Sequence, residues 1–370
     1  MKLEAVELRR IRLPLVAPFE TSFGVQTDRD VLMLKAVTDA GEGWGECVAG
    51  AGPDYSSEYV DGAQHVLINH LIGRLLDREL AAANVPRLLQ PVRGHPMAKA
   101  AIEMAVLDAE LRSRGESFAR FFGATQPEVD CGVSVGIQPS VAALLTTVGD
   151  YLDQGYRRIK LKIKPGWDVE PVRAVRDRFG RVPLQVDANT AYTLADAQHL
   201  AELDQFDLLL IEQPLPEEQM LAHAKLAMTV RTPICLDESI TSAQAATDAI
   251  ELGACSVINI KPGRVGGYLE ARKIHDLCVE AGVRVWMGGM LETGIGRAGN
   301  VAMAAMPGFT LPGDTSASDR YFHRDITEPF VLHDGRLKVP SGPGLGVKVD
   351  QAFLDSITYR TETVSAAAVS

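Results

Sequence analysis

The sequence predicts an α/β fold, a modified (β/α)8 barrel of the TIM type with an α+β capping domain before it. Two observations favour the barrel. Between about residues 151 and 314, short β-branched runs alternate with amphipathic helical stretches, a pattern typical of parallel strands joined by right-handed crossovers. Charged residues also recur at the ends of successive predicted strands, at a spacing of 24 or 25 residues.

Composition sets the class of protein. The chain has 370 residues, of which 46% are hydrophobic and 23% charged, enough for a barrel and a smaller domain. The formal net charge of −11 argues against nucleic acid and anionic membranes as partners. No secretory leader and no apolar stretch of the ~18 residues needed for a membrane span are visible. The five widely spaced cysteines favour reduced thiols, so we expect a cytoplasmic protein.

Residues 1–125 predict the capping domain, because their strand-like and helical stretches do not alternate. The expected elements are two strands, a glycine-rich turn region and two helices, in this order: 4–13, 31–38, Gly41 with Gly43 and Gly45, 56–76 and 98–114. Residues 319–370 contain too many prolines and glycines for another barrel unit. We expect them to pack back on the capping domain.

Residues 126–318 predict the barrel itself. Eight strands are expected, at 132–137, 158–163, 184–187, 208–212, 234–237, 257–261, 284–288 and 309–313. Helices are expected between them, for example at 170–179, 194–203, 243–252 and 269–281. The last of these helices should end before Gly282, since glycine commonly terminates helices.

Five charged residues stand at strand ends, where burial would favour apolar ones. They are Lys162, Asp187, Glu212, Asp237 and Lys261, separated by 25, 25, 25 and 24 residues. A constant separation places each charge at the same height on successive strands, at the C-terminal mouth where barrel enzymes build their active sites. Any one of them could be a structural ion pair, but five in step favour a functional site.

The three acids among these residues predict a metal site. Asp187, Glu212 and Asp237 would converge as three anions, which repel one another strongly without a cation. Carboxylate oxygens without histidine or cysteine suit Mg²⁺, and we expect that Mn²⁺ or Co²⁺ could substitute. The alternative is a carboxylate cluster neutralised only by lysines.

The lysines on either side of the acids predict acid–base chemistry. Lys162 and Lys261 flank the three carboxylates, and Lys160 shares a strand face with Lys162. A lysine that acts as a base near neutral pH needs a lowered pKa, which a second ammonium group and a divalent cation would provide. Lys160 could instead serve to pair with a carboxylate.

The sequences around these residues resemble the enolase superfamily, in its muconate lactonizing enzyme subgroup. The stretches that carry the resemblance are Lys160-Leu161-Lys162, Val186-Asp187-Ala188-Asn189, Ile211-Glu212-Gln213-Pro214, Leu236-Asp237-Glu238-Ser239 and Asn259-Ile260-Lys261-Pro262. Further stretches resemble the o-succinylbenzoate synthase and N-acylamino acid racemase families: 18–24, 156–159, 288–297 and 311–316. Lys261 argues against the mandelate racemase subgroup, which uses a His–Asp pair instead.

The resemblance implies roles for these residues. Lys162 and Lys261 would be the acid–base pair on opposite faces of the substrate, and Asp187, Glu212 and Asp237 would bind Mg²⁺. This superfamily is known for a lysine base combined with Mg²⁺ that stabilises an ene-diolate. Supporting roles would fall to Lys160, Asn189 and Glu238.

Substrate contacts are expected from loops around the barrel mouth. Phe19 and Phe23 belong to a stretch between Pro18 and Gly24 that is compatible with a lid, and Tyr55 follows another glycine-rich stretch. The remaining substrate-binding candidates lie at the ends of the first, seventh and eighth predicted strands: Ser134, Gly289, Met290, Asp314 and Ser316.

The implied function is Mg²⁺-dependent removal of a proton α to a carboxylate from a small molecule. It would serve the dehydration of 2-succinyl-6-hydroxy-2,4-cyclohexadiene-1-carboxylate to o-succinylbenzoate, the racemisation of N-acylamino acids such as N-succinylamino acids, or both. Dipeptide epimerase and muconate cycloisomerase are alternatives, and a metal-free Schiff-base lyase using Lys162 is an alternative from another class. By analogy with the family, a homo-oligomer is expected, a dimer or an octamer.

One glycine motif is interpreted as a coincidence. Gly294, Gly296 and Gly299 match the GxGxxG pattern of dinucleotide-binding proteins. That pattern binds a dinucleotide in the first strand–helix turn of an open sheet, whereas here it follows the seventh strand of a barrel. We therefore expect no NAD site.

Overall fold

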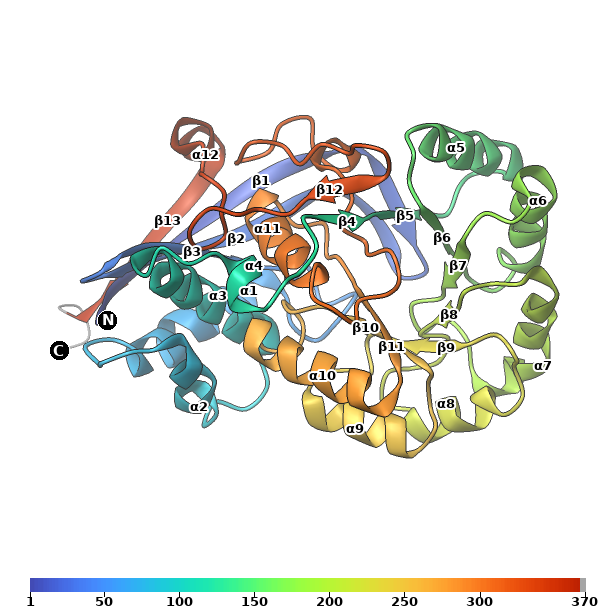
Figure 1. Cartoon of the computed structure of the whole chain (residues 1–370), viewed down its shortest axis with the longest axis horizontal. Coiled ribbons are helices and arrows are strands. Elements are labelled where there is room, and N and C mark those ends of the chain that lie inside the picture. Colours follow the sequence, from blue (N-terminus) through green and yellow to red (C-terminus); the bar gives the residue numbers. More distant parts are fainter. Residues whose placement is uncertain (367–370) are drawn as a thin grey trace.

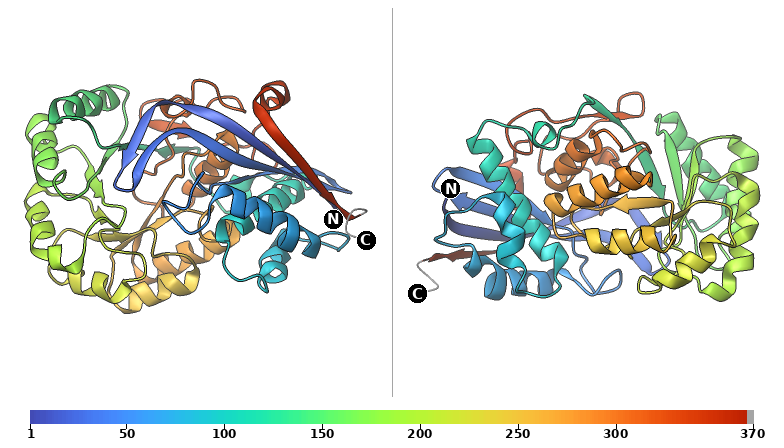
Figure 2. Two further views of the ribbon diagram at one scale, coloured as in Figure 1. Left: turned by 180° about the vertical axis from the view of Figure 1, so that it is seen from behind. Right: turned by 60° about the horizontal axis from the view of Figure 1, so that its bottom comes forward.

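The computed structural model describes residues 1–366, which form two large sheets and a small two-stranded one (Figure 1). An antiparallel sheet has the strand order β13-β1-β2-β3, and a parallel sheet of seven strands runs from β11 to β5 in unbroken order. The second sheet is curled, and helices α5 to α10 form an arc around its outside (Figures 1 and 2). This arrangement confirms the predicted α/β barrel with a separate N-terminal α+β part.

The antiparallel sheet is built on one long hairpin. Strand β1 (Leu3–Thr21) pairs with β2 (Gly24–Thr38) up to the turn, where Thr21 faces Gly24. The sequence predicted only the base of this hairpin and assigned 18–24 to a loop. The strands continue past Pro14 because the pairing register shifts between Pro14 and Phe19, and such an irregularity accommodates proline in a strand.

Strand β3 (Gly41–Cys47) occupies the stretch where the sequence predicted a turn region. Its glycines are needed for close packing against helix α3 (Pro96–Ser113). A Cβ atom on Gly43 would lie 2.2 Å from the carbonyl oxygen of Ala105, and one on Gly45 would lie 2.1 Å from that of Ala101. The prediction was wrong because glycine was interpreted as a chain bend, whereas here it lets a helix approach a strand.

The helices of the first part follow the prediction approximately. The predicted helix at 56–76 is a shorter helical run, which begins as α1 (Val60–Val66) and continues through one π-turn and one 3₁₀ turn to Arg74. The predicted helix at 98–114 is α3. Two short helices complete this part, α2 (Val85–Leu89) and α4 (Phe118–Phe121).

The parallel sheet contains seven of the eight predicted barrel strands. Their bounds are β5 (Gly132–Val135), β6 (Arg158–Lys162), β7 (Leu184–Asp187), β8 (Ile211–Glu212), β9 (Ile234–Leu236), β10 (Val257–Ile260) and β11 (Arg284–Met287). The helices between them are α5 (Val141–Asp153), α6 (Val169–Phe179), α7 (Ala197–Leu200), α8 (Met220–Ala227), α9 (Ala243–Glu251) and α10 (Tyr268–Ala281). Helix α10 ends at Ala281 with Gly282 in the left-handed conformation, as the sequence predicted.

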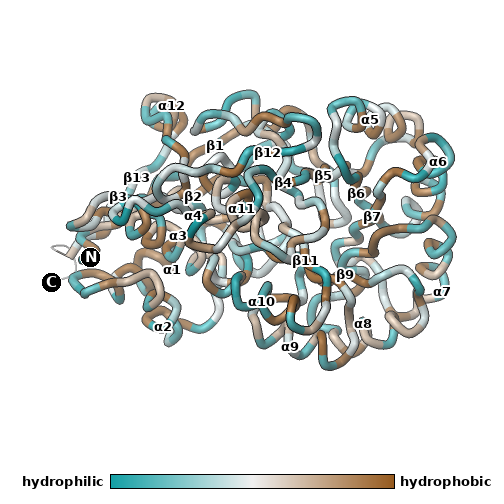
Figure 3. Tube along the Cα trace, in the orientation of Figure 1, coloured by the Kyte–Doolittle hydropathy of each residue, from teal (hydrophilic) through white to brown (hydrophobic). Residues whose placement is uncertain are grey.

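Hydropathy along the barrel helices fits their position. Hydrophilic and hydrophobic residues are interspersed along α6 and α10 (Figure 3), as expected for helices that bury one face on a sheet. Capping side chains set the starts of several of them: Ser140 accepts a hydrogen bond from Ala143 N, and Ser242 accepts one from Ala245 N. The sequence therefore specifies both the buried face and the first residue of these helices.

The predicted eighth strand at 309–313 is not a regular strand. This segment follows helix α11 (Gly294–Ala304) and forms only isolated bridges, Phe309 with Val285 and Gly313 with Cys131. Two backbone hydrogen bonds still join it to both edges of the sheet, from Gly132 N to Gly313 O and from Asp314 N to Met287 O, each 2.8 Å long. Pro312 has no N–H to donate, which prevents a continuous ladder.

The C-terminal segment returns to the first sheet. Strand β12 (Arg336–Lys338) pairs with β4 (Glu128–Asp130), and after α12 (Gln351–Ile357) strand β13 (Thr358–Ser365) pairs antiparallel with β1. Strand β13 consequently lies beside β1, the first strand of the chain (Figure 1). Within residues 1–366, no helix combines the length and apolar character needed to cross a membrane.

Candidate active site

The strand-end charges converge on one end of the curled sheet. Lys162, Asp187 and Glu212 are direct register partners on β6, β7 and β8. Asp237 and Lys261 lie two and four residues beyond that row, because Glu212 pairs with Cys235 and Cys235 pairs with Val257. Barrel strands are tilted, so a row at constant height advances along successive strands. The offsets are even, which keeps all five side chains on the same face of the sheet.

Lys162 is held by two oxygen atoms on the neighbouring strand. Its Nζ donates hydrogen bonds to Asp187 Oδ2 and Asn189 Oδ1, both at 2.6 Å. Asn189 also donates from Nδ2 to Glu238 Oε1 at 2.8 Å. The Asn189 side chain therefore links Lys162 to Glu238 and fixes the direction of the Lys162 ammonium group.

Lys261 has a comparable arrangement on the other side. Its Nζ donates to Asp237 Oδ2 at 2.6 Å and to the hydroxyl of Tyr55 at 3.3 Å, and it lies 5.4 Å from the centre of the Tyr55 ring. Arg264 donates from Nη2 to the carbonyl oxygens of Asp237 and Glu238. Lys162 and Lys261 thus approach the same space from strands on opposite sides of the acidic residues.

Lys160 lies at the centre of the acidic group. Its Nζ is 2.7 Å from Asp314 Oδ2, 3.0 Å from Glu212 Oε2 and 3.2 Å from Asp187 Oδ2. Burial opposes its charge, but these three carboxylates outweigh burial and raise the pKa of Lys160 well above its ordinary value. Lys160 is therefore a fixed cation, the pairing role that the sequence left open.

The pKa values of the carboxylates diverge. Burial, together with repulsion by Asp187 and Asp237, raises the pKa of Glu212 to about 8 against the attraction of Lys160. Burial would also raise the pKa of Asp187, but Lys162 and Lys160 outweigh it and hold that pKa below its usual range. Burial, and then repulsion by Asp237, raises the pKa of Glu238 to about 7. One buried site therefore contains acids that ionise over a wide range of pH.

The charge of Lys261 is stabilised by its acidic neighbours. Burial is the largest single influence and lowers the pKa of this lysine, but Asp237 and the groups around it together outweigh burial and raise the pKa well above its ordinary value. The ion pair with Asp237 at 2.6 Å is the strongest of these opposing contacts. The lowered pKa expected of a lysine base beside a divalent cation stays a prediction.

The acidic residues fit a hard divalent cation. Asp237 Oδ1 and Glu238 Oε2 are buried and have no hydrogen-bond partner within residues 1–366, the nearest cation to Asp237 Oδ1 being Arg264 Nε at 3.6 Å. Unpaired buried carboxylate oxygens are costly unless a cation or a donor completes them. The described residues contain no ready-made cluster of three or more His, Cys, Asp or Glu ligands. The lysine ammonium groups occupy the space between the carboxylates.

A small cavity of about 60 Å³ adjoins these charges. Three lysines line it, Lys160, Lys162 and Lys261, together with Asp314 and Asn189. Most of the other sequence-predicted contacts line it as well: Phe19, Phe23, Tyr55, Ser134, Gly289 and Met290. The Oγ atom of Ser134 is buried without a hydrogen-bond partner in the described part of the chain, so it is available to a ligand.

Two predicted contacts have a different setting from the one expected. Ser316 is not among the residues that line the cavity, and its hydroxyl donates to the carbonyl of Gly132 at 3.1 Å. Phe19 belongs to strand β1 and not to a loop, although Phe23 does lie in the hairpin turn. The hairpin tip is joined to the barrel by hydrogen bonds from Ser22 Oγ to Asn189 O and from Ile137 N to Glu20 O.

Backbone strain is concentrated at this site. Asn189, Thr190, Gln213 and Leu291 all have positive φ angles, between 36° and 67°, which non-glycine residues rarely adopt. Such strain persists where the surrounding structure fixes it and is common at functional sites. At Gly288, a Cβ atom would lie 2.7 Å from Lys261 Cγ, so glycine there leaves room for the lysine.

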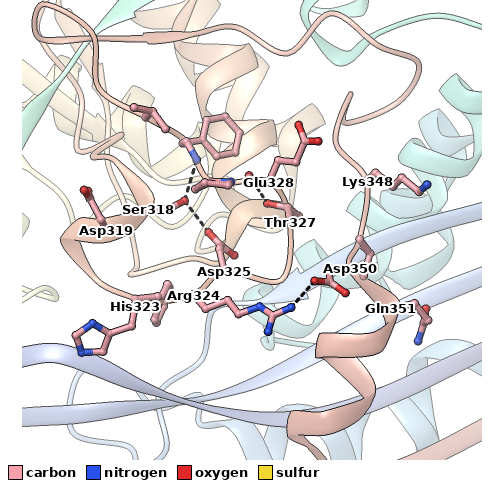
Figure 4. A pocket seen from close by; sticks show the side chains of 15 residues that line it. Ser318, Asp319, His323, Arg324, Asp325, Thr327, Glu328, Lys348, Asp350 and Gln351 are labelled. Atoms are coloured by element: carbon pink, nitrogen blue, oxygen red, sulfur yellow. Dashed lines mark hydrogen bonds and ion pairs between the residues drawn. The ribbon is translucent and has the colours of Figure 1, made fainter.

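A larger hollow of about 810 Å³ lies elsewhere, between the segments 318–331 and 348–351 (Figure 4). Some of its polar groups are paired with one another: Ser318 donates to Asp325, and Arg324 pairs with Asp350 at 2.8 Å. None of the sequence-predicted site residues lines it. Its size does not make it the chemical centre, because the convergent lysines and acids lie at the smaller cavity.

Sequence reasoning missed several residues of the site. Arg158 pairs with Asp314 at 2.8 Å, and Asn259 donates to Glu212 Oε1 at 2.6 Å. Strand alternation could have found both, because Arg158 lies two residues before Lys160 and Asn259 two before Lys261. Arg29 and Arg264 carry no such signal, since their positions depend on tertiary packing.

Two family models match the chain. The model of the mandelate racemase / muconate lactonizing enzyme N-terminal domain matches residues 5–123. The enolase C-terminal domain-like model matches residues 143–353. Together they include strands β2, β3 and β6 to β11 and all five strand-end charges.

Individual relatives extend over nearly the whole chain. It is 66% identical to an N-succinylamino acid racemase from Amycolatopsis, over 97% of this chain and 98% of the relative. It is 48% identical to an o-succinylbenzoate synthase from Geobacillus kaustophilus, over 97% and 96% of the two chains. A crystal structure of an enolase superfamily member from Listeria innocua matches with a TM-score of 0.95 at 42% identity, covering 99% of each chain. This chain therefore belongs to the enolase superfamily, in the family of the mandelate racemase and muconate lactonizing enzymes.

Proposed function

We propose that this enzyme removes the α-proton of a small carboxylate and uses that chemistry to racemise N-succinylamino acids and to form o-succinylbenzoate. The observation that carries the proposal is the position of Lys162 and Lys261 on either side of one acidic centre. The printed names of the 66% and 48% identical relatives indicate the two substrates. Both substrates carry a succinyl group and a hydrogen α to a carboxylate.

Asp187, Glu212 and Asp237 are proposed to hold Mg²⁺, with Mn²⁺ or Co²⁺ as substitutes. When bound, the ion would supply positive charge to the substrate carboxylate and stabilise the negative charge left by the departing proton. Sharing Asp237 with the ion would weaken the pairing of that carboxylate with Lys261, which would bring the pKa of Lys261 down toward a value suited to proton transfer.

Each lysine then has a defined task. Lys162 takes the α-proton from one face of the substrate, oriented by Asp187 and Asn189. For racemisation, Lys261 delivers a proton to the opposite face, and the roles reverse for the other enantiomer. For dehydration, the negative charge left on the ring expels hydroxide, which takes the proton back from Lys162 and leaves as water, while Lys261 acts as a stabilising cation.

A dipeptide substrate is less well supported. Its ammonium group would need a free acid near the end of the eighth barrel segment. Asp314 is the only acid in 314–316, and it already pairs with Arg158 and Lys160. Muconate cycloisomerase also remains as an alternative within the family. The alternative from another class, a metal-free Schiff-base lyase, depends on Lys162 alone and is separated by experiment.

The test is a pair of assays on purified protein supplied with Mg²⁺. We expect both dehydration of the cyclohexadiene precursor to o-succinylbenzoate and racemisation of N-succinylamino acids. EDTA should abolish both, and Mg²⁺ should restore them. The absence of both activities would contradict the proposal. Borohydride trapping of a substrate on Lys162 without metal would favour the lyase.

A further inference from the structure

The cavity at the lysines is too small for the whole proposed substrate. Its volume is about 60 Å³, whereas ligand sites commonly enclose about 300 to 1,000 Å³. The reacting carboxylate and its α-carbon can lie there, beside Lys162 and Lys261. The succinyl arm must extend into an adjoining space.

Two hollows adjoin the cavity and share its aromatic wall of Phe23 and Tyr55. The first, about 220 Å³, lies on the side of β2 and also shares Gln26, Arg29 and Gly50 with the cavity. The second, about 230 Å³, lies on the side of the barrel and shares Asn189. The ring centres of Phe23 and Tyr55 are 5.5 Å apart, so the two rings form a partition between the two hollows.

Charge favours the first hollow for an arm that ends in a carboxylate. The barrel-side hollow is lined by Asp54, Glu217, Glu218 and Glu238 and by no lysine or arginine. The first hollow also has acidic lining residues, but it contains Arg29. Of its three acids, Asp54 lines both hollows and so does not distinguish them. The other two are already paired, Asp30 with Arg10 at 2.5 Å and Asp28 with Arg12 at 3.7 Å.

Arg29 has unused binding capacity. Its side chain is 3% exposed, and its one hydrogen bond within residues 1–366 runs from Nη2 to Val48 O at 3.2 Å, while Nε is buried without a partner. No carboxylate of the described chain lies within ion-pair distance of it. The nearby Glu46 is engaged with Thr293 and Gly296. An arginine forks naturally onto a carboxylate.

We infer that Arg29 is the residue that binds the distal carboxylate of the succinyl arm, with the arm lying in the hollow between β2 and Tyr55. This inference rests on the proposed function and narrows its specificity to acyl groups with a terminal anion. Arg29 then determines which substrates bind well, whereas Lys162 and Lys261 carry out the proton transfer.

The test compares two substrates that differ only at the end of the arm. N-succinyl-L-phenylalanine and its neutral amide, N-succinamoyl-L-phenylalanine, have the same length and shape. Wild-type enzyme should prefer the N-succinyl compound in kcat/KM. In Arg29→Met that preference should fall by about 10- to 100-fold, the value of a hydrogen bond to a charged group, whereas Arg29→Lys should keep part of it. The preference is the ratio of two kcat/KM values measured on the same variant. A lower folded fraction reduces both values equally and therefore cancels.

A second variant leaves Arg29 in place. Gln26 lines both the cavity and the hollow, and Gln26→Glu would place a negative charge in the space proposed for the distal carboxylate of the arm. It should reduce the same preference by about tenfold. Pro216→Glu is the matched control, because it adds the same charge to the barrel-side hollow, and it should leave the preference unchanged.

The outcomes separate this inference from the proposed function. If the wild-type enzyme racemises neither compound, the proposed function is wrong. Equal kcat/KM on both compounds in the wild type, an equal loss on both in Arg29→Met, or an equal effect of Gln26→Glu and Pro216→Glu would leave the racemase standing and overturn the role of Arg29.

Discussion

Lys160 touches three carboxylates at once, on β7, on β8 and in the irregular eighth segment. A buried ammonium group with three acidic partners keeps the acids close together and limits their mutual repulsion. The centre of the Trp286 ring lies 4.8 Å from Lys160 Nζ. This ring covers Lys160 on the side that faces the interior of the barrel. Lys160 therefore organises the site, and this leaves Lys162 and Lys261 free for chemistry.

The base role of Lys162 has a direct test. Lys162→Ala should lower the rate of α-proton exchange of one enantiomer in deuterated water by at least about 10²- to 10⁴-fold, the usual contribution of a positioned base. Exchange is followed by NMR separately for the L and D forms of an N-succinylamino acid, because Lys261 can still act on the other enantiomer. Lys225→Ala is the control, because Lys225 is an exposed lysine on α8. Wild-type exchange of both enantiomers in Lys162→Ala would remove Lys162 from the base role.

At the scale of the elements, β3 and α3 depend on two glycines. Gly43→Ala or Gly45→Ala forces a methyl group onto the backbone of α3 and should destabilise the protein by about 1 to 3 kcal/mol or more. Gly73→Ala is the control. Its Cβ would meet nothing within 4 Å, and it should be neutral or slightly stabilising. Urea unfolding of the three variants measures the difference, and equal stabilities would contradict the packing argument.

Helix α11 begins on a buried acid from the other sheet. Glu46 of β3 accepts hydrogen bonds from Thr293 N and Gly296 N, which ties the capping domain to the barrel. Burial raises the pKa of Glu46 to about 7. The unfolded chain therefore loses this proton near pH 4.5, while the folded chain keeps it until about pH 7.

This difference predicts a pH dependence of stability. As the pH rises from about 4.5 to 7, the unfolded state gains from ionising Glu46 and the folded state does not, so stability falls by roughly 3 kcal/mol from this group. Glu46→Gln should remove that part of the fall. Denaturant unfolding at pH 4.5 and 7.5 checks it, with the exposed Glu251→Gln as the control. An unchanged pH profile in Glu46→Gln would contradict the assignment.

The sequence predicted the elements whose signal is local. Charges such as Asp187 and Glu212 are conspicuous because buried strands rarely end in them, and Gly282 ends α10 by its own conformational freedom. The irregularity of the eighth segment was not predictable. Pro312 interrupts the hydrogen-bond ladder only where strands lie on both sides of it, and those two strands are known only from the structure. Arg29 was missed for a similar reason, since a single arginine in a strand gives no sign of the cavity beside it.

At the scale of the whole molecule, metal binding should be visible as stability. A cation held by residues of β7, β8 and β9 binds only the folded chain, so Mg²⁺ at 100 times its Kd should add about 2.7 kcal/mol to the free energy of unfolding. The thermal midpoint should rise accordingly. Asp237→Asn should lose most of the Mg²⁺-dependent rise, and Asp248→Asn, an exposed acid on α9, should keep it. A rise of equal size in both variants would place the ion elsewhere.

The pairing of β1 with β13 has a consequence for the order in which the chain is made. Ala5 lies opposite Ser365 in this sheet, so β1 finds its outer neighbour only after the whole barrel between the two strands has been made. Until then the outer side of β1 is an unprotected edge, which is the kind of surface that pairs with strands of other chains. The barrel strands can pair in order as they emerge, but the capping sheet has to wait for residues 358–365. A nascent chain stalled before residue 358 should therefore hold a barrel beside an open sheet, the form most in need of a chaperone.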